Sequence, residues 1–137
     1  MSVREIKFRA WDKREKRMGE VTGFRFSKSQ YPSVHVRFKH NDKIIDDRYY
    51  FGQEDGCDNV ILMQFTGLYD KNGKEIYEGD IVTGLFDHTE IIGHIIYGSD
   101  ATFFIYRKGL FGIGLNNAKD WLEVIGNIYE SPELLKE

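Results

Sequence analysis

The sequence has one cysteine, Cys57, in 137 residues, which excludes an internal disulfide and a zinc site built from four thiolates. It has two prolines and no apolar run of about 18 residues, the length that predicts a membrane-spanning helix. The N-terminus carries Arg4, Lys7 and Arg9, and no apolar core of signal-peptide length follows them. These absences predict a cytoplasmic protein that makes no use of a membrane.

Motifs that carry known chemistry are also missing. No phosphate-binding, dinucleotide-binding or nucleophile-elbow string occurs. The acidic neighbours of Cys57 disfavour its reactive thiolate form, and His88 and His94 do not have the spacing of zinc ligands. The segment from Asp70 to Glu75 has its glycine at the fourth position, whereas a calcium loop requires glycine at the sixth. We therefore expect no cofactor, no metal and no catalytic residue, and a function that is not enzymatic.

The sequence is rich in residues that suit strands. Aromatic side chains make up 15% of the chain, and they favour pleated, half-buried surfaces. The Asn72-Gly73 pair between alternating flanks is a strong hairpin signal. Further turn signals follow at intervals of about ten residues, a pattern typical of a barrel or sandwich. The segment 78–82, followed by 93–97, looks like the first two strands of an SH3-like barrel. We expect a mainly β fold with such a small barrel in its second half.

The first half of the chain also contains patterns that predict strands. Alternation predicts strands over 6–10 and 18–26, where Gly19 and Gly23 indicate a bulge or a close backbone approach. A turn at 40–43 predicts another hairpin between 34–38 and 44–51. Within its second strand Asp46 and Asp47 should face opposite sides, which excludes a close carboxylate pair.

The chain is short enough for one domain, 1–137. An acidic, glycine-containing loop at 52–59 would divide sublobes 1–51 and 60–137. Near the end, a helical turn is predicted at Pro132 to Lys136, with Ser131 as its N-cap.

Charge is distributed unevenly along the chain. Residues 1–40 hold 11 Lys and Arg against 4 Asp and Glu, a net +7, and residues 41–137 hold 8 against 18, a net −10, which gives the total of −3. Two interpretations stay open. One is a surface for nucleic acid or another charged partner. The other is neutralisation of the two parts by each other, within the chain or across a symmetric interface.

The basic front end is the one constellation with a functional interpretation. Small β proteins bind single-stranded nucleic acid by placing aromatic rings among basic side chains. Glu15 and Glu20 interrupt the basic cluster, so a solvated hairpin tip is the competing interpretation. The candidate residues for binding a partner or nucleic acid are Trp11, Lys13, Arg14, Lys16, Arg17 and Arg37.

Several strings in the chain resemble the YopX family of phage and prophage proteins. They are Phe8 to Asp12, Met63 to Leu68, the Asp70 to Gly73 hairpin, Ile76 to Val82 and Val124 to Glu130. The resemblance implies a phage or prophage origin and a bacterial cytoplasm, and it brings no catalytic residue. We expect an accessory protein that binds a protein partner or assembles with itself as a homo-oligomer. The alternative is a nucleic-acid-binding protein that uses the basic N-terminal hairpin.

Overall fold

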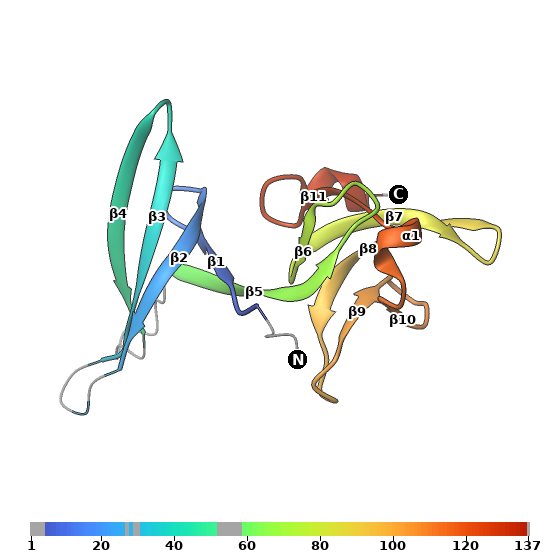
Figure 1. Ribbon diagram of the computed structural model, residues 1–137, viewed down its shortest axis with the longest axis horizontal. Helices are drawn as coiled ribbons and strands as arrows, with labels where there is room; N and C mark the ends of the chain where they lie inside the picture. Colours follow the sequence, from blue (N-terminus) through green and yellow to red (C-terminus); the bar gives the residue numbers. More distant parts are fainter. Residues whose placement is uncertain (1–4, 27, 29–30, 52–58, 137) are drawn as a thin grey trace. The chain divides into compact units, whose positions relative to one another are not determined.

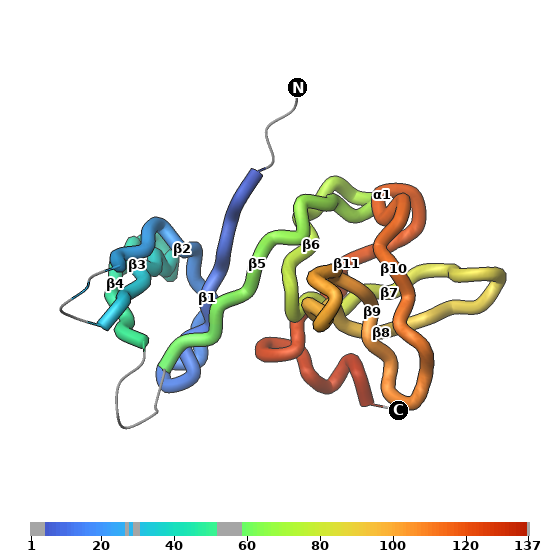
Figure 2. The backbone as a smooth tube through the Cα atoms, turned by 90° about the horizontal axis from the view of Figure 1, so that it is seen from below, coloured from blue at the N-terminus to red at the C-terminus, as the bar shows by residue number. Residues whose placement is uncertain are grey.

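A computed structural model describes the chain except for residues 1–4, 27, 29–30, 52–58 and 137. Its contacts divide the chain into two compact units. We call Lys7–Gln64 the hairpin unit, and Phe65–Glu137 with Met1–Ile6 the second unit. Strand β5 (Val60–Tyr69) carries the chain from the first into the second (Figure 2). The predicted dividing loop lies, except for Asn59, outside the described residues.

The hairpin unit is an antiparallel sheet with the order β4-β3-β2-β1-β5 (Figure 1). Its strands are β1 (Phe8–Asp12), β2 (Arg17–Arg25), β3 (Ser33–His40), β4 (Lys43–Tyr50) and the first half of β5. Two predicted hairpins lie in this unit, the basic N-terminal hairpin and the one with its turn at 40–43. Both are confirmed, as β1 paired with β2 and β3 paired with β4. Asn41 and Asp42 adopt φ values of 47° and 66°, the left-handed pair that a two-residue hairpin turn requires.

The core of the hairpin unit consists of Ala10, Val34, Val36, Phe38 and Val60. Glycine is needed at position 19, because a Cβ there would lie 2.5 Å from a methyl carbon of Val36 and 2.7 Å from the ring of Phe38. The predicted bulge is found between Val21 and Gly23. The predicted bulge is therefore confirmed at Gly23, whereas at Gly19 the close approach is made by side chains of β3 and not, as predicted, by another backbone.

The second unit contains an antiparallel sheet with the order β10-β9-β8-β7-β11. Its elements are β6 (Glu75–Tyr77), β7 (Asp80–Phe86), β8 (Thr89–Tyr97), β9 (Phe103–Tyr106), β10 (Ile113–Gly114), helix α1 (Ala118–Trp121), β11 (Glu123–Asn127) and the 3-10 helix η1 (Pro132–Leu135). Ala118 and Leu122 fill the same core as Val82 and Ile95.

The prediction of a mainly β fold is confirmed, but the small barrel in the second half is wrong. Among the described strands, β10 pairs with β9 and β11 pairs with β7, and no pairing joins these two edge strands. A strand of two residues offers too few backbone groups for closure. Helix α1 and its flanking residues cover the apolar face instead.

The C-terminal helical turn is confirmed as η1, but Ser131 caps it differently from the prediction. Its hydroxyl makes no capping hydrogen bond, and its carbonyl oxygen accepts the Leu134 N–H at 3.1 Å. No helix in the described part of the chain has the length and apolar character needed to cross a membrane.

Candidate basic hairpin and edge strand

The basic turn between β1 and β2 is built on a buried carboxylate. Asp12 is 3% exposed, and its Oδ1 accepts the backbone N–H groups of Arg14 at 2.9 Å and Glu15 at 3.0 Å. Its carbonyl oxygen accepts the N–H of Lys16 at 2.8 Å, and Lys16 takes a left-handed φ of 55°. The acidic residue that precedes the basic run therefore fixes the conformation of the turn.

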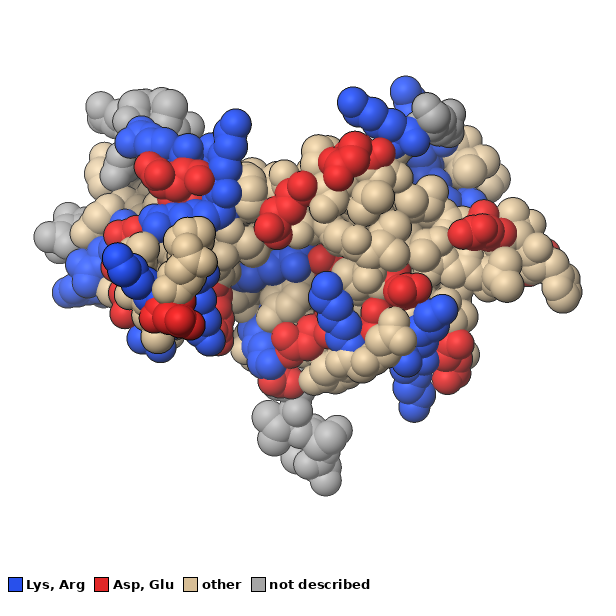
Figure 3. All heavy atoms as spheres, turned by 90° about the horizontal axis from the view of Figure 1, so that it is seen from above, with Lys and Arg blue, Asp and Glu red and all other residues tan. Residues whose placement is uncertain are grey.

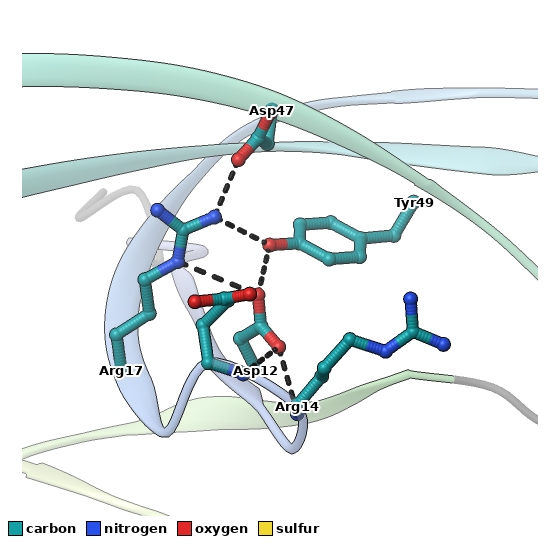
Figure 4. A network of polar contacts seen from close by, with 6 residues as sticks. Asp12, Arg14, Arg17, Asp47 and Tyr49 are labelled. Atoms are coloured by element: carbon teal, nitrogen blue, oxygen red, sulfur yellow. Dashed lines mark hydrogen bonds and ion pairs between the residues drawn. The ribbon is translucent and has the colours of Figure 1, made fainter.

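Arg17 belongs to a polar network and is not a free cation (Figure 4). Its guanidinium forms an ion pair with Asp47, lies 3.2 Å from the Tyr49 hydroxyl and is 3.4 Å from the Asp12 carboxylate. It also lies 3.8 Å from the ring centroid of Phe38, as a cation on an aromatic face. These contacts tie the turn to β4.

The network controls the protonation of its acidic members. Burial acts to raise the pKa of Asp12, but hydrogen bonds from the Glu15 N–H, the Tyr49 hydroxyl and the Arg14 N–H, with the charge of Arg17, place it below the ordinary value. Tyr49 donates to Asp12 at 2.5 Å. Burial, followed by this hydrogen bond to a carboxylate, raises the pKa of Tyr49 to about 12.

The structure separates the six predicted site residues into three groups. Lys13, Arg14 and Lys16 are exposed on the turn. Trp11 is half-buried in β1, opposite Met18 and Ile61. Arg17 and Arg37 are both paired with aspartates of β4, Arg37 with Asp46 at 2.9 Å.

These pairs neutralise part of the basic front end. Arg17 and Arg37 belong to the basic residues 1–40, and their partners Asp46 and Asp47 belong to the acidic remainder. Basic and acidic side chains are interspersed on the face drawn in Figure 3. The aspartates also use opposite faces of β4, as predicted, because their cross-strand partners Arg37 and Val36 are adjacent in β3.

Strand β4 is the feature that the sequence analysis missed. It pairs with β3 over all eight residues without a register shift, and no described strand lies on its other side (Figure 1). Its residues are mostly exposed, among them Ile44 at 60% and Tyr50 at 41%. Its pattern predicted a strand, but an edge strand is identified only by the pairing order of the whole sheet.

Backbone groups of β4 alternate between β3 and the open edge. The N–H of Phe51, next after β4, donates to the carbonyl oxygen of Pro32 at 2.9 Å. Because hydrogen-bonded and non-hydrogen-bonded pairs alternate in an antiparallel ladder, the odd-numbered residues of β4 bond to β3. The even-numbered residues direct their N–H and C=O groups to the edge. These outward residues are Ile44, Asp46, Arg48 and Tyr50.

In the second unit, the acidic residue Asp70 stabilises the fold of that unit. Asp70 is 2% exposed, and its carboxylate accepts the N–H groups of Asn72, Lys74 and Val124, each at 2.9 Å. Burial raises the pKa of Asp70, but these hydrogen bonds outweigh that effect and place it below the ordinary value. The carboxylate of the predicted hairpin is therefore occupied by backbone groups.

The histidines of the second unit do not come together. His88 lies in the turn between β7 and β8, whereas His94 lies within β8 and packs against the Tyr106 ring with centroids 5.3 Å apart. Burial lowers the pKa of His94. A groove of about 470 Å³ beside it also has Glu90 in its lining, an exposed residue at the start of β8. The described residues contain no group of three or more His, Cys, Asp or Glu side chains that could hold a metal ion, and Cys57 lies outside them.

Comparison with known proteins gives a family and a structural relative. The family model described as YopX protein matches residues 7–136. A crystal structure of protein EF1440 from Enterococcus faecalis is similar to this chain with a TM-score of 0.66 and 33% sequence identity, over 98% of this chain and 100% of that one. No curated protein matches. A match over nearly the whole sequence, together with this structural likeness, shows that the chain belongs to the YopX family.

Proposed function

We propose that the chain is a non-enzymatic protein-binding module in which β4 accepts an extended segment of a protein partner. The observation that supports this proposal is the regular, eight-residue edge strand with outward-facing backbone groups. Such an edge is a template for another strand, and strand addition is a common mode of peptide recognition.

The edge lacks several features by which proteins block strand addition. Prolines, bulges and very short strands usually protect an edge. Strand β4 contains no proline and has no register shift against β3. Its outward residues carry one acid, Asp46, and one base, Arg48, between Ile44 and Tyr50. Charges of both signs favour a segment with the complementary pattern over segments in general.

The edge is also held in the extended conformation before any partner arrives. The turn at Asn41 and Asp42 fixes its start, and Arg17 and Tyr49 tie its second half to Asp12. A preorganised strand loses less conformational entropy on binding. Two of the basic residues, Arg17 and Arg37, thus support β4 through ion pairs with Asp47 and Asp46.

Selection from a displayed library of random octapeptides tests this proposal. Immobilised, dilute protein should enrich peptides of strand-forming residues. Arg48→Ala, which keeps the outward N–H, should still bind them, whereas Arg48→Pro, which removes it, should not. Enrichment of no peptide, or equal enrichment on the proline variant, would contradict binding at β4.

A further inference from the structure

We infer that the partner strand is β4 of a second copy of this chain, paired antiparallel about a twofold axis that passes beside Asp47. The inference rests on the proposed strand addition at β4 and names its partner. It follows from the small number of registers in which β4 of one copy can pair with β4 of another.

The outward backbone groups restrict these registers. Only outward residues of the two copies can exchange hydrogen bonds across the new ladder, and these residues are Ile44, Asp46, Arg48 and Tyr50. Three self-pairings align at least three of these four outward residues with outward residues of the other copy. One places Asp46 opposite Asp46, one places Arg48 opposite Arg48, and one places Asp46 opposite Arg48.

The third register is the complementary one. It sets Asp46 opposite Arg48 twice, because the axis repeats the pair, and it sets Ile44 opposite Tyr50 twice. The other two bring like charges face to face: either two Arg48 side chains, which destabilises a sheet, or two Asp46 side chains, each of which already has Arg37 of its own chain as a partner and gains no cation from the other copy. The third register also aligns all four outward residues, so each can exchange backbone hydrogen bonds with its opposite residue.

The opposite face of β4 fits the same register. Here Ile45, 40% exposed, would lie opposite Tyr49 of the other copy. The two Asp47 residues would meet at the axis, and each is already neutralised by the Arg17 of its own chain. The twofold pairing is isologous, so it closes as a dimer and leaves no further β4 edge open.

Cysteine crosslinking tests the register. In a Cys57→Ser background, Asp47→Cys places two thiols at the axis in a non-hydrogen-bonded pair, where Cα atoms lie about 4.5 Å apart and a disulfide can form. Asp46→Cys and Arg48→Cys should each fail to crosslink alone and should crosslink when mixed. A disulfide dimer of Asp46→Cys alone that forms as fast as that of Asp47→Cys, or no disulfide in any arm, would overturn the inference.

Charge exchange gives a second test that leaves Asp47 and the Arg17 network intact, although Asp46→Arg also removes the ion pair with Arg37. Asp46→Arg and Arg48→Asp each create like-charged pairs, so each protein alone should dimerise at least about tenfold more weakly than the wild type. A mixture of the two restores both opposite-charge pairs and should form a heterodimer, measured by analytical ultracentrifugation. Failure of the mixture to associate where the wild type does would overturn the register.

The two proposals can fail separately. If octapeptides bind at β4 but the wild-type chain stays monomeric at every concentration, the further inference is wrong and the proposed function stands. If neither peptides nor a second copy bind, both are wrong.

Discussion

At the scale of single residues, buried carboxylates organise this protein. Asp12 and Asp70 are 3% and 2% exposed, and the carboxylate of each accepts two backbone N–H groups at the turn that follows it. Hydrogen bonds to an ionised carboxylate are stronger than bonds between neutral groups. An aspartate at the end of a strand is thus a structural element in both units.

Replacement of Asp12 by Asn should lower the free energy of unfolding by about 2 kcal/mol, because the amide cannot accept all the hydrogen bonds that the two carboxylate oxygens accept. Urea unfolding near neutral pH measures the change, and the exposed neighbour Glu15→Gln is the control. Equal stability of the two variants would contradict the role of Asp12.

Asp12 should also make the free energy of unfolding depend on pH in the acidic range. Because the pKa of Asp12 is lowered in the folded state, its contribution is present above the ordinary aspartate pKa and is lost as the pH falls through the folded pKa. The stability difference between wild type and Asp12→Asn should therefore shrink on acidification. A difference that stays constant with pH would contradict the ionised, hydrogen-bonded carboxylate.

The contribution of Tyr49 to stability should have the opposite pH dependence. A pKa raised to about 12 means that its contribution is present below the ordinary tyrosine pKa of about 10 and is lost as the pH rises through the folded value. Titration of tyrosinate absorbance should show one late-ionising group that Tyr49→Phe removes. Identical titration curves would contradict the hydrogen bond to Asp12.

At the scale of elements, strand β4 combines a side bonded to β3 with an open edge. Because of this alternation, removal of a backbone N–H should have different effects on stability at neighbouring positions of β4. The odd residues bond to β3 and the even residues face the edge, so their backbone N–H groups are not equivalent.

Proline should therefore be tolerated at position 48 and not at position 47. Arg48→Pro removes an outward N–H and should change the free energy of unfolding by less than about 1 kcal/mol, whereas Asp47→Pro removes a bond to β3 and should cost about 3 kcal/mol. Asp47→Pro also loses the ion pair with Arg17, and the free energy of unfolding of Asp47→Ala measures that part of the loss separately. Equal destabilisation by the two prolines would contradict the assigned alternation.

Packing between β2 and β3 gives a further matched pair of positions. Gly19→Ala should destabilise the chain by about 1 to 3 kcal/mol, because its Cβ would meet Val36 and Phe38 at 2.5 and 2.7 Å. Gly23→Ala is the control, since nothing lies within 4 Å of its Cβ position. Thermal or urea unfolding of both variants measures the difference.

At the scale of the whole molecule, local patterns predicted the strands and turns better than they predicted the pairing order. The turn at Asn41 and Asp42 and the bulge near Gly23 are encoded by adjacent residues. Two partners of Arg17, Asp47 and Tyr49, lie thirty or more residues away in β4, and no local pattern specifies them. The barrel prediction was wrong for the same reason, because closure depends on which distant strands meet.

The most direct measurement of the central claim is hydrogen exchange of the β4 amides over a series of protein concentrations. The N–H groups of Ile44, Asp46, Arg48 and Tyr50 should exchange fast in dilute solution and become protected as concentration rises, while that of Asp47 stays protected throughout. In Arg48→Pro the remaining outward amides should stay fast at every concentration. Outward amides that exchange fast in the concentrated wild type would contradict the claim that β4 pairs with a second copy.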